Sequence, residues 1–473
     1  DDYTSKPLKD AHILFLDMDL LAITDGEGLF NYKYELPNVV QLYITKPGYE
    51  SCFLELSNDH SELIMVRLKE LHLQLDEVII STPKSHNSKN STINIQSNKL
   101  KDLNIIPGSI TESISRIAGV DQVSTGPGIT KPVIRGLSGM RIVTYLNGMR
   151  LENQQWGGEH GIGITDLGIG KLEVIKGPSS LMYGPDALGG VLYFIDEPYS
   201  FQDNIEVGSK TRFESNTMGV EEQVYTKYNK GNIRFNLYGQ FSNHADYSIP
   251  GDDFVNNTRF SNYNLKGSIG YSKDNWITHI RYNYFNGAFG IASHLEDDGH
   301  GHHHGHSHGS ESEEFLTEEQ LRSRITPYQN VQNHFLVWNN KFHLKRGHMV
   351  FNVGRGANTL KEFEDESAPE IQLDLTSINM NVYLNTDIDD KWNLILGHQN
   401  MFQKNRNSKL ASDELIPDAN TNDIGIYGIL NFKYENWHAQ TGIRLDNRSI
   451  EAFNIKPDNS TVERSYDAFN LSF

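Results

Sequence analysis

The sequence predicts a mainly β protein with three parts: a small N-terminal β-sandwich, an α+β domain, and part of a large transmembrane antiparallel β-barrel. From residue 199 onward, runs of about 12 residues alternate apolar and polar side chains, as expected of strands with one apolar face. Short polar turns and long polar segments separate these runs, which is typical of an outer-membrane barrel. The 473 residues contain no run of about 18 apolar residues, so we expect no transmembrane helix.

Residues 1–74 are expected to form a small β domain. Short apolar runs are separated by the turn signals of residues 24–28 and 46–49. Part of this stretch resembles the carboxypeptidase regulatory-like (transthyretin-like) domain. The residues that carry this resemblance are Pro7, Leu8, Ala11, Thr24, Asp25, Gly28, Phe30, Gly48 and Tyr49.

Residues 75–90 differ from both neighbouring parts. The segment from Leu75 to Thr82 is rich in β-branched residues, and a polar tail follows it. Such a segment is suited to adding as an extra strand to the sheet of a partner protein. The alternative is that it forms the first strand of the next domain.

Residues 91–198 are dense in glycine between residues 131 and 190. Two short strands, residues 141–146 and 171–176, each end in a turn signal, Asn147-Gly148 and Gly177-Pro178. A helix is expected over residues 109–117, and strands over 121–125 and 133–135. So many glycines suit a compact domain whose backbone packs closely against a surrounding wall.

Four pieces of this domain resemble, in order, the plug domain of TonB-dependent outer-membrane receptors. They are residues 134–136, 141–148, 172–178 and 181–191. The resemblance implies a plug inside a barrel of about 22 strands, located in the outer membrane of a Gram-negative bacterium. It also implies that residues 1–74 lie in the periplasm and that Leu75 to Thr82 contact the TonB energy-coupling complex. The alternative is a glycine-rich soluble β domain with chance matches.

Residues 199–473 are expected to supply about twelve strands of the barrel. In one strand, residues 233, 235, 237, 239 and 241 form the apolar face and residues 234, 236, 238 and 240 the polar face. Long polar segments at 245–259, 287–326, 360–370 and 404–422 are expected to be extracellular loops. Twelve strands are few for a plugged barrel, so we expect a truncated barrel rather than a narrow closed one. The first residues do not read as a signal peptide, so an exported protein would have lost its start.

A histidine-rich tract is the sharpest local signal. Seven of the 19 histidines fall within fifteen residues, with acidic residues on both sides. Imidazole is a ligand suited to Zn²⁺, Cu²⁺ and Ni²⁺, and glycine and serine spacers favour loose capture over one rigid site. A pH-responsive solvated loop is the alternative. The candidate metal ligands of this tract are His294, His300, His302, His303, His304, His306 and His308.

A second candidate metal site is Glu159-His160, in a polar loop between the two plug strands. A carboxylate next to an imidazole suits Zn²⁺. The pair resembles the plug contribution to the metal site of zinc-importing receptors, in which the barrel supplies the remaining ligands. The candidate barrel ligands are His244, His334 and His398, although the sequence does not say which of them face the lumen.

The composition of the chain argues against several classes of function. The net charge of −19 argues against nucleic-acid binding, which needs excess Lys and Arg. The single cysteine, Cys52, allows no internal disulfide. No catalytic motif is evident, so neither an enzyme nor a cofactor is expected. The resulting hypothesis is import of a metal ion, preferably zinc, through an outer-membrane receptor. The alternatives are copper, nickel, haem or siderophore as cargo, or a surface metal-binding or adhesion protein without transport.

Overall fold

The computed structural model divides the chain into two units, Asp1–Val78 and Ile79–Phe473, and each is described by itself. No helix in the described part of the chain is long and apolar enough to cross a membrane. The described residues are 6–15, 20–30, 39–46, 49, 52–57, 64–68, 94–100, 110–153, 160–201, 203–251, 253–273, 275–292, 316–365, 367–389, 391–434, 437–456 and 458–473.

The first unit contains a four-stranded antiparallel sheet in the order β2-β1-β3-β4. Alternate side chains of β1 and β3, including Ile13, Leu42 and Ile44, are buried on one face of it. Within the described residues this unit has one sheet rather than the two of the expected sandwich, and most of residues 29–34 lie outside them. The strands are β1 (His12–Phe15), β2 (Leu20–Ile23), β3 (Val39–Thr45) and β4 (Cys52–Ser57).

The plug is an α+β domain with a five-stranded sheet in the order β10-β9-β12-β11-β5. Strands β9 and β12 run parallel, and the other pairs are antiparallel. A second sheet has the order β6-β7-β8. The elements are β5 (Asn94–Lys99), α1 (Ile110–Ile114), β6 (Val120–Gly126), β7 (Ile129–Ile134), β8 (Leu137–Ser138), η3 (Gly139–Arg141), β9 (Ile142–Leu146), β10 (Met149–Arg150), β11 (Ile169–Lys176), η4 (Gly177–Tyr183) and β12 (Gly190–Asp196).

Three expectations about the plug elements need correction. The helix α1 has five residues instead of nine, because Ile117 N–H bonds to Ile114 O in a tighter turn and Gly119 then has a positive φ. The strand expected to begin at Arg141 begins one residue later, since Arg141 ends a 3₁₀ turn. Arg135 has a φ of 52° and therefore lies outside β7.

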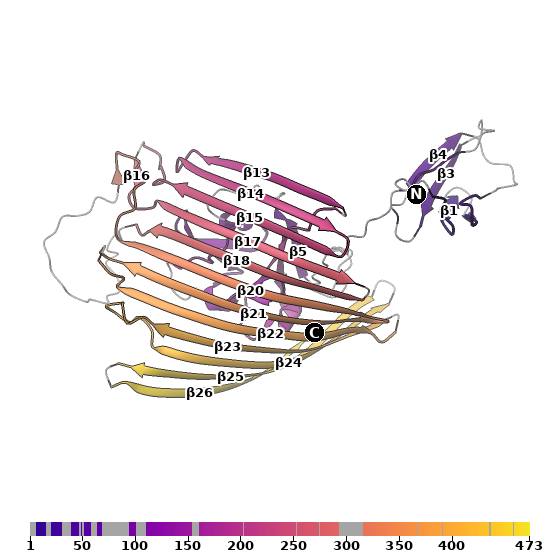
Figure 1. Ribbon diagram of the computed structural model, residues 1–473. Coiled ribbons are helices and arrows are strands. Elements are labelled where there is room, and N and C mark those ends of the chain that lie inside the picture. The colour runs from indigo at the N-terminus through magenta and orange to yellow at the C-terminus, as the bar shows by residue number, and fades with distance from the viewer. Residues whose placement is uncertain are drawn as a thin grey trace. The chain divides into compact units, whose positions relative to one another are not determined.

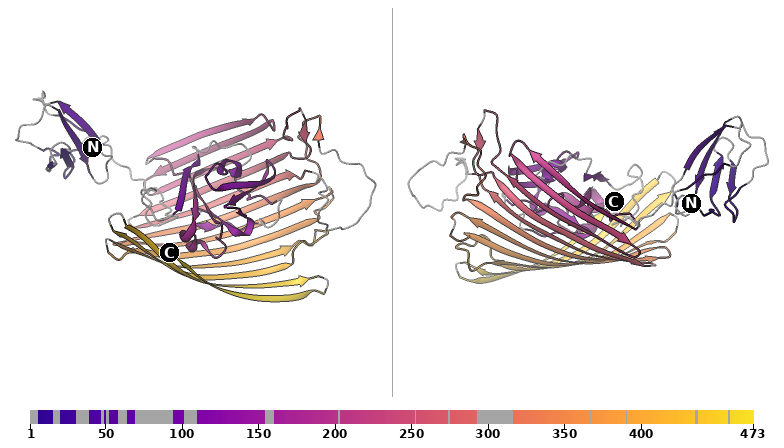
Figure 2. Two further views of the ribbon diagram at one scale, coloured as in Figure 1. Left: turned by 180° about the vertical axis from the view of Figure 1, so that it is seen from behind. Right: turned by 45° about the horizontal axis from the view of Figure 1, so that its top comes forward.

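Twelve long strands form one antiparallel sheet, as the sequence predicts. The sheet curves around the plug as part of a barrel wall (Figures 1 and 2). It is open, with β13 and β26 at its edges, so the closed twelve-stranded alternative is wrong. The strands are β13 (Asn204–Glu214), β14 (Gly219–Lys230), β15 (Ile233–His244), β17 (Phe260–Lys273), β18 (Trp276–Gly290), β20 (Tyr328–Leu344), β21 (Gly347–Phe363), β22 (Ile371–Asp387), β23 (Trp392–Asn407), β24 (Asp418–Tyr434), β25 (Trp437–Ile455) and β26 (Ser460–Ser472).

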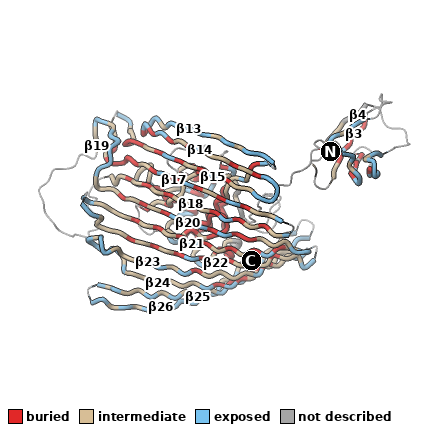
Figure 3. Tube along the Cα trace, in the orientation of Figure 1, coloured by how far each residue is buried: buried red, intermediate tan, exposed pale blue. Residues whose placement is uncertain are grey.

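The wall has its apolar side chains outside and its polar side chains inside. Along β15, Leu237 and Phe241 are exposed, whereas Asn236 and Gln240 are buried against the plug side. The same alternation of buried and exposed positions runs along the neighbouring strands (Figure 3). This confirms the two predicted faces of β15 and suits a wall with lipid on one side and a polar plug on the other.

The connections differ in length between the two ends of the wall. At one end, consecutive strands are separated by two to four residues, as between Lys230 and Ile233, Leu344 and Gly347, and Asp387 and Trp392; we call it the short-turn end. The other, long-loop end includes the small two-stranded antiparallel sheet of β16 (Phe254–Val255) and β19 (Leu316–Thr317). Two of its loops are shorter than predicted, because β21 continues to Phe363 and β23 to Asn407.

Candidate functional site

His160 contacts the barrel wall at the long-loop end. Its side chain is buried, and its Nε2 lies 3.0 Å from Oε1 of Glu362, next to the end of β21. Backbone packing brings the plug loop there, since Gly161 lies against the backbone of Thr130 in β7. The structure therefore pairs one predicted ligand with a wall carboxylate. The other plug candidate, Glu159, lies outside the described residues.

An imidazole paired with a carboxylate is chemically suited to a transition-metal ion. When Nε2 donates to the carboxylate, the neutral ring carries its lone pair on Nδ1. Zn²⁺ sites usually take three or four protein ligands. No group of three or more His, Cys, Asp or Glu residues able to hold a metal occurs in the described part of the chain. The described residues thus contain two side chains, His160 and Glu362, that suit the predicted site.

The three candidate barrel ligands do not join His160. His244 is buried on the plug side, where its Nδ1 lies 2.8 Å from the Thr217 hydroxyl and its ring stacks on Phe260. His334 shares the outer face of β20 with the exposed Leu336, and bonds to a tyrosine hydroxyl on the neighbouring strand.

His398 lies on the outer face of β23. It alternates with Gln399, whose Nε2 donates to a plug carbonyl, and shares its face with the exposed Leu396 and Phe402. The alternation of apolar and polar neighbours along β23 is the sequence signal that indicates the direction of the His398 side chain. The expectation that His334 and His398 could be lumen-facing ligands is therefore wrong.

The histidine-rich tract lies outside the described residues, but the strands that flank it are described. Gly290 at the end of β18 pairs with Tyr328 at the start of β20. Tyr328 in turn pairs with Phe363, the residue after Glu362. In the sequence the tract therefore falls between β18 and β20, and β20 is the neighbour of β21, which holds the wall partner of His160.

A larger charged site connects the plug to the wall near η4; we call it the ionic cluster. Its members are Arg150, Glu152 and Asp186 of the plug and Asp423 and Arg448 of the wall. Arg150 Nη1 lies 2.8 Å from Asp186 Oδ2 and also pairs with Glu152. Arg448 Nη2 lies 2.6 Å from both Asp186 Oδ2 and Asp423 Oδ2.

Charge and burial oppose each other in the ionic cluster. Burial alone would raise the pKa of Asp186, but Arg150 and Arg448 outweigh it and lower that pKa to about 2. Burial raises the pKa of Glu152 despite Arg150, and the charge of Asp186 raises it further. Asp186, with an arginine on each side, is therefore the central acid of the cluster.

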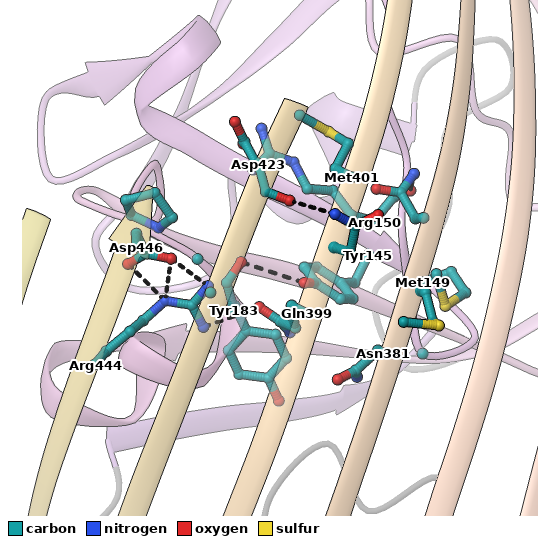
Figure 4. Close-up of a pocket in the computed structure, with 17 residues that line it drawn as sticks. Tyr145, Met149, Arg150, Tyr183, Asn381, Gln399, Met401, Asp423, Arg444 and Asp446 are labelled. Carbon is teal, nitrogen blue, oxygen red and sulfur yellow. Dashed lines mark hydrogen bonds and ion pairs between the residues drawn. The ribbon is translucent and has the colours of Figure 1, made fainter. Parts of the chain in front are cut away.

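A small gap lies beside the ionic cluster, between the plug and strands β22 to β25 (Figure 4). Tyr145 and Arg150 border it from the plug, and Gln399, Arg444 and Asp446 from the wall. Its space of about 40 Å³ has room for a few waters and excludes a large organic molecule. Arg444 pairs with Asp446 and donates to Gln399 Oε1 at 2.9 Å.

These charged contacts were not predicted, although the sequence contains one signal for them. Arg444, Asp446 and Arg448 occupy every second position of β25. Charged residues at this spacing share one face, and a membrane strand cannot turn that face toward lipid. What the sequence does not contain is the position of their plug partners, which are Asp186 for Arg448 and the Leu181 carbonyl for Arg444.

These observations define a class: a compact plug seated against a curved wall of long strands that is apolar outside and polar inside. Residues 84–191 match the family model described as the TonB-dependent receptor plug domain. This match assigns residues 84–191 to the plug-domain family, and the plug and wall together have the fold of the solved transporters compared below.

Two curated relatives are similar to this chain over a short stretch. The vitamin B12 transporter BtuB of Photobacterium profundum is 36% identical over 88 residues, 18% of this chain and 14% of that protein. BtuB of Vibrio vulnificus is 24% identical over 119 residues, 23% of this chain and 19% of that protein.

Solved structures share the fold of the plug and wall. A structure titled copper transporter OprC has a TM-score of 0.63 at 15% identity, and the match covers 80% of this chain and 60% of that one. The FrpB iron transporter from Neisseria meningitidis has a TM-score of 0.62 at 14% identity, with 80% and 61% covered. The chain thus spans about 60% of the length of these receptors and a much smaller part of the BtuB proteins.

Proposed function

We propose that the chain is part of an outer-membrane importer for a divalent transition-metal ion, with zinc as the preferred cargo. The observation that carries this proposal is the tract of seven histidines between His294 and His308, flanked by acidic residues. Neutral imidazoles bind Zn²⁺, and glycine and serine spacers favour several ligand sets that form in turn. Zinc enters this proposal as transported substrate, and no resident cofactor is required.

The ion would pass from the tract to the plug. The tract joins β18 to β20, and Tyr328 at the start of β20 pairs with the residue after Glu362. A metal released from the histidines would therefore meet His160 and Glu362 at the same end of the wall. Glu159 is proposed as a third ligand.

Energy coupling would act from the other side of the membrane. We assign the segment from Leu75 to Thr82 to strand addition onto the TonB protein, and residues 1–74 to a periplasmic accessory domain. Metal binding at the plug would release the segment, and pulling on it would open a path through the barrel. The host would be a Gram-negative bacterium, since that is where two-membrane coupling of this kind operates.

Copper is the second candidate cargo. One of the similar solved structures is titled a copper transporter, and imidazole binds Cu²⁺ more strongly than Zn²⁺ in the usual affinity order. Haem and siderophores are less favoured, because the described gap beside the plug has room for only a few waters.

Calorimetric titration of the purified chain with Zn²⁺, Cu²⁺, Ni²⁺ and haemin tests the proposal. The matched variant replaces all seven tract histidines with glutamine, which preserves loop length and polarity. We expect this variant to lose most of the bound Zn²⁺ and to slow growth of the host under zinc limitation. Unchanged binding and growth would contradict metal capture. Tight binding of haemin, with weak binding of all three ions, would indicate that the cargo is haem and not a metal ion.

Blocking the proposed contact with TonB distinguishes an importer from a surface protein that binds metal without transporting it. In that case a variant that blocks strand addition, such as Ile79→Pro, would leave metal accumulation by cells unchanged.

A further inference from the structure

A second histidine pair lies at the short-turn end of the wall. His343 near the end of β20 and His348 near the start of β21 are directly opposite each other across the tight hairpin. The two strands also pair Asn339 with Asn352, four residues further from the turn. Asn339 Nδ2 donates to the plug carbonyl of Asn147 at 2.9 Å, so this face points to the plug. With a period of two, both histidines share it.

The two rings present unsatisfied nitrogen atoms. Nε2 of His343 and Nε2 of His348 are both shielded from solvent and have no hydrogen-bond partner. The backbone N–H of His343 donates to Asn275 O at 2.7 Å, which fixes the strand end. The ring of Tyr383 meets that of His348 edge to face, with centroids 6.1 Å apart. Buried polar atoms normally have a partner, so two such atoms on directly opposite residues call for a ligand.

We propose that His343 and His348 form a cross-strand binding site for a late first-row divalent ion, Cu²⁺, Ni²⁺ or Zn²⁺. Directly opposite residues in an antiparallel pair have Cβ atoms about 4.5–5.5 Å apart, and an imidazole nitrogen coordinates zinc at about 2.0–2.1 Å. Two rings on one face can therefore reach a single ion. Water completes the coordination, because the described residues contain no third ligand group.

Two charged residues on the same face tune this site in opposite directions. Asp387 of β22 lies two residues beyond Asn385, the partner of His348, and is half-buried. Its carboxylate favours a bound cation. Lys341 of β20 precedes His343 by two residues and carries a positive charge that disfavours one. The site is therefore expected to bind metal moderately and to release it, as a transfer position requires.

This inference does not rest on the proposed cargo. It concerns binding at the short-turn end of β20, whereas the histidine-rich tract precedes the opposite end of that strand in the sequence. If import of a metal holds, the pair lies where an ion that has passed the plug would leave the barrel.

Copper(II) spectroscopy on the whole chain tests the pair. The parent protein carries glutamine in place of the seven tract histidines and of His160, and it is purified without a histidine tag, so that the other proposed metal ligands do not mask the site. The variants His343→Gln and His348→Gln remove one ring each. The matched control is His438→Gln, because His438 shares the inner face of β25 with Arg444 at the same end but is opposite Lys433.

We expect the parent to bind one equivalent of Cu²⁺ with hyperfine coupling to two imidazole nitrogens. Each single variant should lose that equivalent, and the control should keep it. Lys341→Gln should tighten binding, and Asp387→Asn should weaken it. Equal stoichiometry in the parent and both single variants would overturn the assignment, as would a parent spectrum with no pair of coupled nitrogens. The latter measurement needs no substitution in the hairpin, so it stands even if a variant fails to fold.

Discussion

The ionic cluster leads to a quantitative prediction for Asp186→Asn. This substitution keeps the shape of the side chain and removes the charge that lies between Arg150 and Arg448. Glu152 still pairs with Arg150, and Asp423 still pairs with Arg448. The plug should therefore remain seated, but the wall should hold it less firmly at η4.

The pKa of Asp186 sets the size of the effect. A carboxyl pKa lowered from 3.8 to about 2 corresponds to about 2.5 kcal/mol of stabilisation at neutral pH. The variant regains part of this free energy. The charge of Asp186 also raises the pKa of Glu152, and the substitution removes that repulsion. We therefore expect a loss of about 1 to 2.5 kcal/mol. Since the folded pKa is depressed, this stabilisation is present above about pH 4 and is lost as the pH falls toward 2.

Native-state hydrogen exchange in detergent measures this loss. Amides of η4 and β10 should exchange about 5-fold to 60-fold faster in Asp186→Asn at pH 7, because their local opening becomes easier. Asp121→Asn is the control, since this plug carboxylate is exposed and accepts a bond only from the next backbone N–H. Exchange that is unchanged in Asp186→Asn, or equally fast in the control, would refute the reasoning.

Three further predictions test other parts of the molecule. Glu362→Gln should weaken zinc binding at His160 by about 10-fold to 100-fold in calorimetry, and an unchanged affinity would remove Glu362 from the site. Gly190→Ala should destabilise the plug by about 1–3 kcal/mol in the same exchange assay, because Gly190 has a φ of 134° and an added Cβ would lie 2.8 Å from Ile175 O; wild-type protection would contradict this. Ile79→Pro removes a backbone N–H from the proposed coupling strand, so uptake should stop while zinc binding is retained; loss of both would point to misfolding instead.

The strands of the wall are easier to predict from the sequence than the contacts that the wall makes with the plug. Alternation with a period of two depends only on strand geometry, so the faces of β15 and the count of twelve strands follow from it. Strand ends are harder to predict, because beyond the lipid both faces of a strand are wet and the alternation fades. The backbone ladder continues there, which is why β21 extends to Phe363 through a stretch predicted to be loop.

The pairing of plug with wall is the part that the sequence leaves open. His160 and Glu362 are 202 residues apart, and Asp186 and Arg448 are 262 apart. Nothing local relates such residues, since their meeting depends on how the sheet curves around the plug. The direction of His398 was different, because the apolar side chains of Leu396 and Phe402 on its own strand already indicate the outer face.

The nature of the plug–wall contact bears on how a plug could move. Much of it joins wall side chains to plug backbone carbonyls: Asn333 to Gly163, Asn339 to Asn147, Gln399 to Met182, and Lys266 to Leu167 and Gly168. Each bond from an amide side chain contributes only about 0.5–1.5 kcal/mol net, and each bond of the charged Lys266 about 1.5–3 kcal/mol, because water replaces the bond when the contact opens. Apolar wall side chains, such as Phe335 and Ile429, join the plug core at a few positions. A pulling force would therefore break many weak, water-replaceable contacts one after another, and would need to exceed the apolar and ionic contacts only locally.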